Sequence, residues 1–384
     1  MKRNLFVFML ALFTGFISFA QEEYLDADAD ENEKIYLGGE AYEVKTFHQN
    51  FKKGKPKSVI LLIADGMSVT HLHAALTANK GSLFIENMKN MGLIKTYSAD
   101  NYNTDSAAAG TALSTGEKTY GGAIGVDINK KPLKTILEEA EEKGLATGLV
   151  STSAITHATP AAFIAHQESR NMYEEIAADF LKTDIDVFIG GGYKHFTERK
   201  DGRNLVEELK QKGYRVEQDI NTIKNIKEGK LAGLTAAEHN GRMDERGDML
   251  PIATQTAIQI LSSNKKGFFM MVEGSQVDWG GHANSTIYII EDMLDFDRTV
   301  GVALEFAAKD KNTLVVVTSD HETGGMTILD GNYETGMVKG EFSSGGHTGV
   351  MVPVFAYGPG ASEFTGIMDN TDVHNRIKKL LIGK

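Results

Sequence analysis

Short apolar runs alternate with amphipathic stretches along most of the chain after Lys57. Six apolar runs have the length and residue types of buried strands: Ser58–Ala64, Ala146–Ser151, Ile185–Ile189, Gly267–Val272, Thr313–Thr318 and Val352–Tyr357. Between several of them lie amphipathic stretches such as Pro132–Lys143 and Met172–Lys182. This alternation predicts an α/β fold, a three-layer sandwich whose mostly parallel central sheet carries helices on both faces.

The pattern weakens near the start of the chain and in its middle. Residues 21–35 are acidic and poor in apolar side chains, which predicts a mobile arm within an N-terminal segment of residues 21–57. The alternating Asp residues of this arm resemble a calcium loop only faintly, because the Gly and the distal Glu of that pattern are missing. Residues near 194–250 are more polar and contain only weak strands. We expect them to form a surface insertion within one catalytic domain, residues 58–384.

The first twenty residues are predicted to be a signal peptide. Lys2 and Arg3 form a basic start. An apolar run from Leu5 to Phe19 follows, and Ala20 is a small residue at the usual cleavage position. The alternative is a membrane anchor, but the run would span only about 24 Å of a hydrocarbon core about 30 Å thick. We therefore expect cleavage near Ala20, export to the periplasm or the medium, and no stable membrane anchor.

Composition narrows the chemistry in two ways. The 384 residues carry a formal net charge of -12, which argues against a nucleic-acid partner because phosphate backbones select basic surfaces. The chain contains no cysteine, so disulfides, thiol catalysis and thiolate metal ligands are all excluded. Any metal site must therefore use imidazole, carboxylate, hydroxyl or water ligands.

Side chains that can bind metal ions follow the apolar runs or lie close to them. In chain order they are Asp65, His157, Thr159, Glu273, Asp278, His282, Asp320, His321 and His347. The carboxyl ends of parallel strands share one edge of a sheet, so we expect these side chains to converge there. Each residue alone has an ordinary explanation, such as a turn at Asp65–Gly66. If they were buried together without partners they would destabilise the fold, whereas zinc suits imidazole with carboxylate and magnesium suits carboxylate with hydroxyl.

A second candidate is the segment NTDSAAAGTALSTGEKT, residues 103–119. Its small residues from Ser106 onward predict the start of a helix, where exposed backbone N–H groups favour anions. The alternative is that Asp105 or Ser106 serves only as the N-cap of that helix. A Ser106 nucleophile has no His base nearby in the sequence, so it would need activation, which a metal ion can supply.

Together these segments resemble the alkaline phosphatase family, from about Ser58 to Leu381. The resemblance rests on six motifs: DGM at Asp65, TDSAA around Ser106, HATPAAFIAHQESR from His157 to Arg170, VEGSQVDWGGH from Val272 to His282, TSDHETGG from Thr318, and GGHTG around His347. Because all six occur in the order typical of the family, the match is far more specific than any one motif.

The resemblance implies two zinc ions and one magnesium ion per chain. The implied ligands are Asp278, His282 and His347 for the first zinc, Asp65, Asp320 and His321 for the second, and Asp65, Thr159 and Glu273 for magnesium. Ser106 would be the nucleophile beside the second zinc. Arg170 would bind the phosphate, and Asp105 would orient Arg170. The implied reaction is hydrolysis of small-molecule phosphate monoesters to an alcohol and inorganic phosphate through a phosphoserine, in a homodimeric enzyme.

Two positions depart from part of the family. Some members have Asp where this chain has His157, and Lys or His where it has Trp279, whereas others share the His/Trp pair. Trp279 is the only Trp in the chain, and shielding of the cleft and stacking on substrate are both open roles for it.

Two other functions compete with this interpretation. Phosphodiesterases and nucleotide pyrophosphatases of the same superfamily resemble the chain in their zinc ligands, but they lack counterparts of Arg170 and Glu273 and generally use Thr as nucleophile. A non-catalytic binder of phosphate or metal predicts a broken ligand set or a missing nucleophile, and neither is seen.

Overall fold

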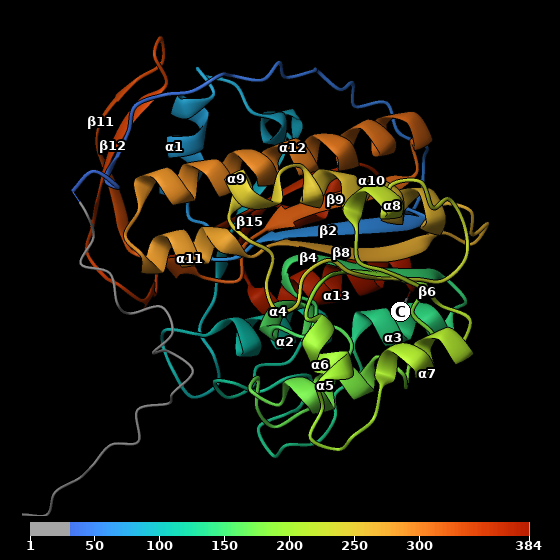
Figure 1. The fold of residues 1–384 in the computed structure, drawn as a ribbon. Coiled ribbons are helices and arrows are strands. Elements are labelled where there is room, and N and C mark those ends of the chain that lie inside the picture. The colour runs from blue at the N-terminus through green and yellow to red at the C-terminus, as the bar shows by residue number, and fades with distance from the viewer. Residues whose placement is uncertain (1–30, 384) are drawn as a thin grey trace, which may run out of the picture.

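The computed structural model describes residues 31–383, and the expected signal peptide at residues 1–20 lies outside this range. A ten-stranded sheet runs through the described molecule between two layers of helices (Figure 1). In spatial order its strands are β15 (Gly366–Asp369), β3 (Asn90–Lys95), β14 (Val352–Tyr357), β9 (Thr313–Thr318), β2 (Ser58–Ala64), β8 (Phe268–Gly274), β4 (Ala146–Ala154), β5 (Val187–Gly191), β7 (Leu231–Leu234) and β6 (Arg215–Glu217). Every neighbouring pair is parallel except the two pairs made by β14, so β14 alone runs against the others.

Alternate residues of the central strands enter two separate cores, one on each face of the sheet. On β2, Ile60 and Leu62 enter one core while Leu61 enters the other, as the two-residue period of a strand requires. The first core is covered by α1 (Val69–Ala78), α10 (Met249–Leu261) and α12 (Thr286–Asp310). The second is covered by α2 (Ser106–Thr115), α3 (Ile136–Glu142), α5 (Tyr173–Asp179), α7 (Leu205–Gln211) and α13 (Asn370–Leu381). The expected three-layer α/β sandwich is confirmed (Figure 1).

Several shorter helices and strands complete the described fold. The short helices are α4 (Ala158–Ala161), α6 (Tyr193–Thr197), α8 (Ile220–Ile223), α9 (Met243–Arg246) and α11 (Gln276–His282), with 3-10 turns at Phe84–Asn87 and Ala361–Phe364. Outside the large sheet, β10 (Glu322–Thr323) pairs with β13 (His347–Thr348), and β11 (Met326–Asn332) forms a hairpin with β12 (Met337–Phe342). Within residues 31–383, no helix has both the length and the apolar character needed to cross a bilayer.

Most of the arm expected at residues 21–35 lies outside the described residues, because the structure describes the chain only from residue 31. At the end of this arm, Ile35 forms strand β1 together with Tyr36, and β1 pairs with β12. Lys34 adds an ion pair to Glu341 at 2.9 Å. Tyr42 and other aromatic side chains of this segment pack against the core that α1, α10 and α12 cover. The segment from residue 31 onward is therefore held to the folded domain by strand pairing, an ion pair and aromatic packing with residues distant in sequence.

The polar segment near 194–250 also does more than cover the surface. It contributes β7 and β6, which extend the large sheet beyond β5. These strands have only four and three residues, which is why their apolar pattern is weak in the sequence.

Candidate active site

The register of the central strands brings the expected ligands to one edge of the sheet. Asp65, Glu273 and Asp320 lie at or just beyond the aligned ends of β2, β8 and β9. The turn after β2 needs a glycine, because Gly66 has a φ of +79° and a Cβ there would lie 2.7 Å from the Cα of Asp278. The helix that carries Asp278 therefore approaches the end of β2 closely.

Asp65, Asp320 and His321 form one candidate metal group. A ligand atom from each lies within 4.8 Å of the others, and all three side chains are buried. His321 Nε2 lies 3.4 Å from Asp65 Oδ1 and 3.2 Å from Asp320 Oδ2. In the described part of the chain, these two carboxylate oxygens have no hydrogen-bond partner. Burial raises the pKa of both carboxyls, that of Asp320 to about 7, so the group fits a divalent cation that would offset this cost.

Asp278, His321 and His347 form a second candidate group. The resemblance implied His282 where this group has His321. His282 is nevertheless close, with its Nε2 3.4 Å from Asp278 Oδ1 and 3.2 Å from His347 Nε2. His321 enters the group because its ring stacks on that of His347 with centroids 3.6 Å apart. His321 thus belongs to both groups.

Carbonyl oxygens orient two of these rings. His282 Nδ1 lies 2.8 Å from the carbonyl oxygen of Gly345, and His347 Nδ1 lies 2.7 Å from that of Thr104. A carbonyl oxygen only accepts, so Nδ1 carries the proton in each neutral ring, and Nε2 is the nitrogen that could bind a metal ion. Burial opposes ionisation of Asp278, but its neighbours His282 and His347 bring its pKa well below the usual value.

Thr159 and Glu273 complete the expected ligand set near Asp65. Thr159 Oγ1 donates to Asp65 Oδ2 at 3.3 Å. Glu273 Oε2 accepts from Ser151 at 2.5 Å and from Ser153 at 3.3 Å, while its Oε1 has no hydrogen-bond partner among residues 31–383. Burial raises the pKa of Glu273. Neither serine is expected from the motifs, although the run of hydroxyl residues Ser151–Ser153 in a buried strand is a usable signal.

Ser106 is the first residue of α2, and Asp105 is its N-cap. Asp105 Oδ1 accepts from the N–H of Ala108 at 3.0 Å, so the capping role belongs to Asp105. The Ser106 hydroxyl instead faces the candidate metal groups, with Oγ 3.2 Å from His321 Nε2. The N-terminus of the buried helix α2 favours negative charge at this position.

Arg170 is held between Asp105 and His157. Its Nη1 donates to Asp105 Oδ2 at 3.1 Å, and its Nη2 lies 3.2 Å from His157 Nε2. Asp105 is fixed in turn by the N–H of Gly122, 3.1 Å from each carboxylate oxygen. Burial and the charge of Arg170 hold the pKa of His157 well below its usual value, so this imidazole is neutral and accepts from the guanidinium.

Trp279 lies against His157 and against His239, a residue that no sequence motif indicates. The ring centroids of Trp279 and His239 are 5.0 Å apart, and those of Trp279 and His157 are 6.2 Å apart. His239 lies in the polar segment near 194–250, where no motif distinguishes it from a surface histidine.

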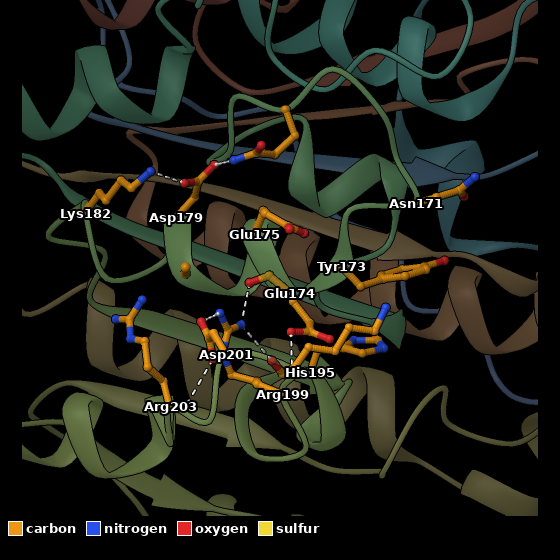
Figure 2. Close-up of a pocket in the computed structure, with 13 residues that line it drawn as sticks. Asn171, Tyr173, Glu174, Glu175, Asp179, Lys182, His195, Arg199, Asp201 and Arg203 are labelled. Carbon is orange, nitrogen blue, oxygen red and sulfur yellow. Dashed lines mark hydrogen bonds and ion pairs between the residues drawn. The ribbon is translucent and has the colours of Figure 1, made fainter.

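A pocket of about 630 Å³ opens elsewhere, between α5 and the loop after α6 (Figure 2). None of the expected metal ligands lines it. Several of its basic groups are paired, Lys182 with Asp179 at 2.6 Å and Arg199 with Asp201 at 2.5 Å (Figure 2). The expected ligands thus converge at the edge of the sheet and not in this pocket.

Known proteins that are similar to the chain point to one family. The family model for alkaline phosphatase matches residues 56–341. Alkaline phosphatase 4 of Bacillus subtilis is 36% identical, over 90% of this chain and 94% of its own. The alkaline phosphatase of Escherichia coli is 34% identical, over 85% of this chain and 86% of its own. Among solved structures, alkaline phosphatase from the Antarctic bacterium TAB5 is 44% identical with a TM-score of 0.81, over 86% of this chain and 99% of its own. A mutant of that enzyme, solved with Mg bound in its M3 site, has the same TM-score.

Proposed function

We propose that Ser106 is the nucleophile with which this chain, which belongs to the alkaline phosphatase family, hydrolyses phosphate monoesters. The protein is an enzyme, an alkaline phosphatase. One observation carries the choice of nucleophile. Ser106 Oγ lies 3.2 Å from His321 Nε2, and His321 belongs to both candidate metal groups.

We propose two zinc ions and one magnesium ion per chain as cofactors. The donor types support this assignment. Imidazoles and carboxylates gather around His321, whereas the Thr159 hydroxyl bonds to the Asp65 carboxylate. The proposed ligands are Asp278, His282 and His347 for one zinc, Asp65, Asp320 and His321 for the other, and Asp65, Thr159 and Glu273 for magnesium. When bound, such ions lower the pKa of a coordinated hydroxyl or water and offset the charge of the phosphate.

Two transfers to and from Ser106 make up the proposed reaction. Ser106 Oγ loses its proton and bonds to phosphorus, and the alcohol leaves with its ester oxygen and takes up a proton. Water then attacks the phosphoserine, the bond from phosphorus to Oγ breaks, and Ser106 regains a proton as inorganic phosphate departs. Nη1 and Nη2 of Arg170 each carry a second N–H beyond those directed at Asp105 and His157, and the proposed role of these groups is to donate to the non-bridging oxygens of the phosphate.

Trapping the phosphoserine tests this proposal. Ser106→Ala should lower kcat at least about a thousandfold while the protein keeps its zinc, because the substitution changes none of the proposed zinc ligands. Wild-type enzyme quenched in acid with substrate should carry phosphate on Ser106, detected by mass spectrometry.

Ser114→Ala is the matched control for this experiment. Ser114 lies on the same helix, and its hydroxyl bonds to the carbonyl oxygen of Ala162 at 2.6 Å. This variant should keep near-normal turnover. Normal turnover by Ser106→Ala would sink the assignment of the nucleophile.

We further propose that the enzyme is exported, with residues 1–20 removed after Ala20, and that it acts as a homodimer on small-molecule monoesters. The basic start and apolar run of the sequence support export, and the family resemblance supports the dimer. N-terminal sequencing of the exported protein tests the cleavage site, and light scattering tests the dimer. The domain layout is also proposed, with residues 58–384 as the catalytic domain and the segment near 194–250 inserted in it.

A further inference from the structure

The loop that joins β4 to α4 carries His157 and is held by two histidines of the polar segment near 194–250. The N–H of Ala154 donates to His239 Nδ1 at 3.0 Å. The hydroxyl of Thr156 lies 2.6 Å from His195 Nδ1. Side chains from a part of the chain that carries none of the proposed ligands therefore fix the loop on which His157 stands.

His239 also packs against the side chains next to the phosphate-binding group. Its ring is nearly perpendicular to those of His157 and Trp279, with interplanar angles of 90° and 82°. The centroid of His239 lies 5.4 Å from that of His157 and 5.0 Å from that of Trp279. Edge-to-face contacts of this kind are favourable and fix the relative tilt of the rings. The three rings form one cluster, with His239 in contact with both partners.

The orientation of His157 depends on this packing. Its Nε2 must accept from Arg170, because a guanidinium only donates, so Nδ1 carries the proton of the neutral ring. That buried Nδ1 has no hydrogen-bond partner in the part of the chain that the structure describes. With no hydrogen bond at Nδ1 to set the tilt of the ring, the neighbouring rings of His239 and Trp279 set it.

His239 itself is well fixed. The next residue, Asn240, donates through Nδ2 to the carbonyl oxygen of Thr152 on β4 at 3.1 Å. Gln276 Nε2 donates to the carbonyl oxygen of Asn240 at 2.7 Å. Gln276 is the first residue of α11, the helix that carries Trp279. The backbone beside His239 is therefore tied both to β4 and to the helix of its ring partner.

We propose that His239 is a positioning residue for phosphate binding, which acts by packing against His157 and so holding Arg170 in place. This inference rests on the proposed function, because it assigns a role to Arg170 in binding the phosphoryl group. Arg170 is hydrogen-bonded to Asp105 on one side and to His157 on the other. If the ring of His157 rotates, Arg170 loses one of these two hydrogen bonds. A misplaced guanidinium weakens phosphate binding in the substrate and in the product alike.

Two substitutions separate the ring of His239 from its hydrogen bond. His239→Asn keeps an acceptor for the N–H of Ala154 but removes the ring, whereas His239→Phe keeps a ring but removes the acceptor. Both are measured on zinc- and magnesium-loaded enzyme with inorganic phosphate as the probe. Because Trp279 is the only Trp in the chain, its fluorescence reports phosphate binding without any turnover. His73→Asn is the control, since His73 lies exposed on α1 and bonds to Tyr333.

The inference predicts a loss of phosphate affinity for the variant without the ring. His239→Asn should raise both KM and the inhibition constant of phosphate about tenfold, with kcat changed less than about threefold. His239→Phe should stay within about twofold of wild type for all three. Metal content should be unchanged in both variants, and Tm should be unchanged in His239→Asn, whereas His239→Phe should have a lower Tm because the buried N–H of Ala154 loses its acceptor.

The inference is wrong if His239→Asn binds phosphate as tightly as wild type, or if His239→Phe loses as much phosphate affinity as His239→Asn. It is also wrong if the loss of phosphate affinity in His239→Asn occurs only together with a loss of zinc or a lowered Tm. A wild-type enzyme that neither hydrolyses monoesters nor binds phosphate would instead overturn the proposed function, so the two failures are distinguishable.

Discussion

Among single residues, Arg170 has no hydrogen bond to a proposed metal ligand within residues 31–383. Its partners are Asp105 and His157. Arg170→Ala should therefore leave metal content unchanged and lower kcat/KM for a monoester roughly 10- to 100-fold, the loss of charge-assisted bonds of about 1.5–3 kcal/mol. A diester has one fewer charged oxygen to present, so its kcat/KM should fall less. Assays of both substrates with wild type and variant measure the change in preference.

Arg203→Ala is the matched control, because Arg203 is half-exposed and paired with Glu208 at 2.6 Å, at the pocket away from the ligand-bearing edge. Its kinetics should match those of wild type. If Arg170→Ala slows monoester and diester by the same factor, Arg170 does not discriminate between them.

At the same scale, Glu273 and His282 should control different metals. Glu273 accepts hydrogen bonds from Ser151 and Ser153, whereas His282 lies beside Asp278 and His347. Glu273→Gln should lower bound magnesium and spare zinc. His282→Ala should lower zinc by about one ion per chain and spare magnesium. Elemental analysis of dialysed protein measures both, and loss of the same metal from both variants would contradict the assignment.

Among elements, the N-terminal segment is joined to α12 through Tyr42. The hydroxyl of Tyr42 donates to Asp297 Oδ2 at 2.6 Å, and the ring stacks on Phe84 with centroids 5.8 Å apart. Tyr42→Phe keeps the stacking and removes the hydrogen bond to a buried carboxylate. It should lower the free energy of unfolding by about 1.5–3 kcal/mol at pH 8, measured by urea unfolding.

The effect of Tyr42→Phe should depend on pH. Burial raises the pKa of Asp297 to about 6, although the bond from Tyr42 opposes this shift. A raised folded pKa means that the stability from this group is complete below the unfolded value near 3.8 and is lost as pH rises through about 6. Without the Tyr42 hydroxyl, the free energy of unfolding should fall further as pH rises. The difference in this free energy between wild type and Tyr42→Phe should therefore be smaller at pH 5 than at pH 8. Tyr333→Phe, at an exposed bond to His73, should show neither effect, and a mobile N-terminal segment would make Tyr42→Phe equally silent.

For the whole molecule, the proposed metals should stabilise the fold as well as drive catalysis. Burial raises the pKa of Asp65, Asp320 and Glu273, so each carboxylate costs stability when it is charged and has no cation beside it. A chelator should therefore abolish turnover and lower Tm by roughly 5–15 °C, because a ligand that binds only the folded state stabilises it. Zinc with magnesium should restore both, and calcium should not. Full activity or an unchanged Tm in chelator would contradict the metal assignment.

The three-layer frame could be predicted from the amino-acid sequence alone, and so could the convergence of Asp65, Glu273 and Asp320 at one edge of the sheet. Buried parallel strands need continuous apolar runs, and SVILLIA before Asp65 is such a run. The carboxyl ends of parallel strands meet at one edge, so residues such as Asp320 and Glu273 were expected to converge before any contact was known. The same residues carry the family resemblance.

The side chains that support this edge could be identified only from the tertiary structure. His239 comes from a polar segment with no motif, and Ser151 is one of several hydroxyl residues of β4, yet each contacts a residue of the candidate site. Ile35 and Tyr36 become a strand only because β12 supplies their partners. In each case the stabilising contact joins residues far apart in the chain, and a local pattern of apolar and polar positions carries no information about such a partner.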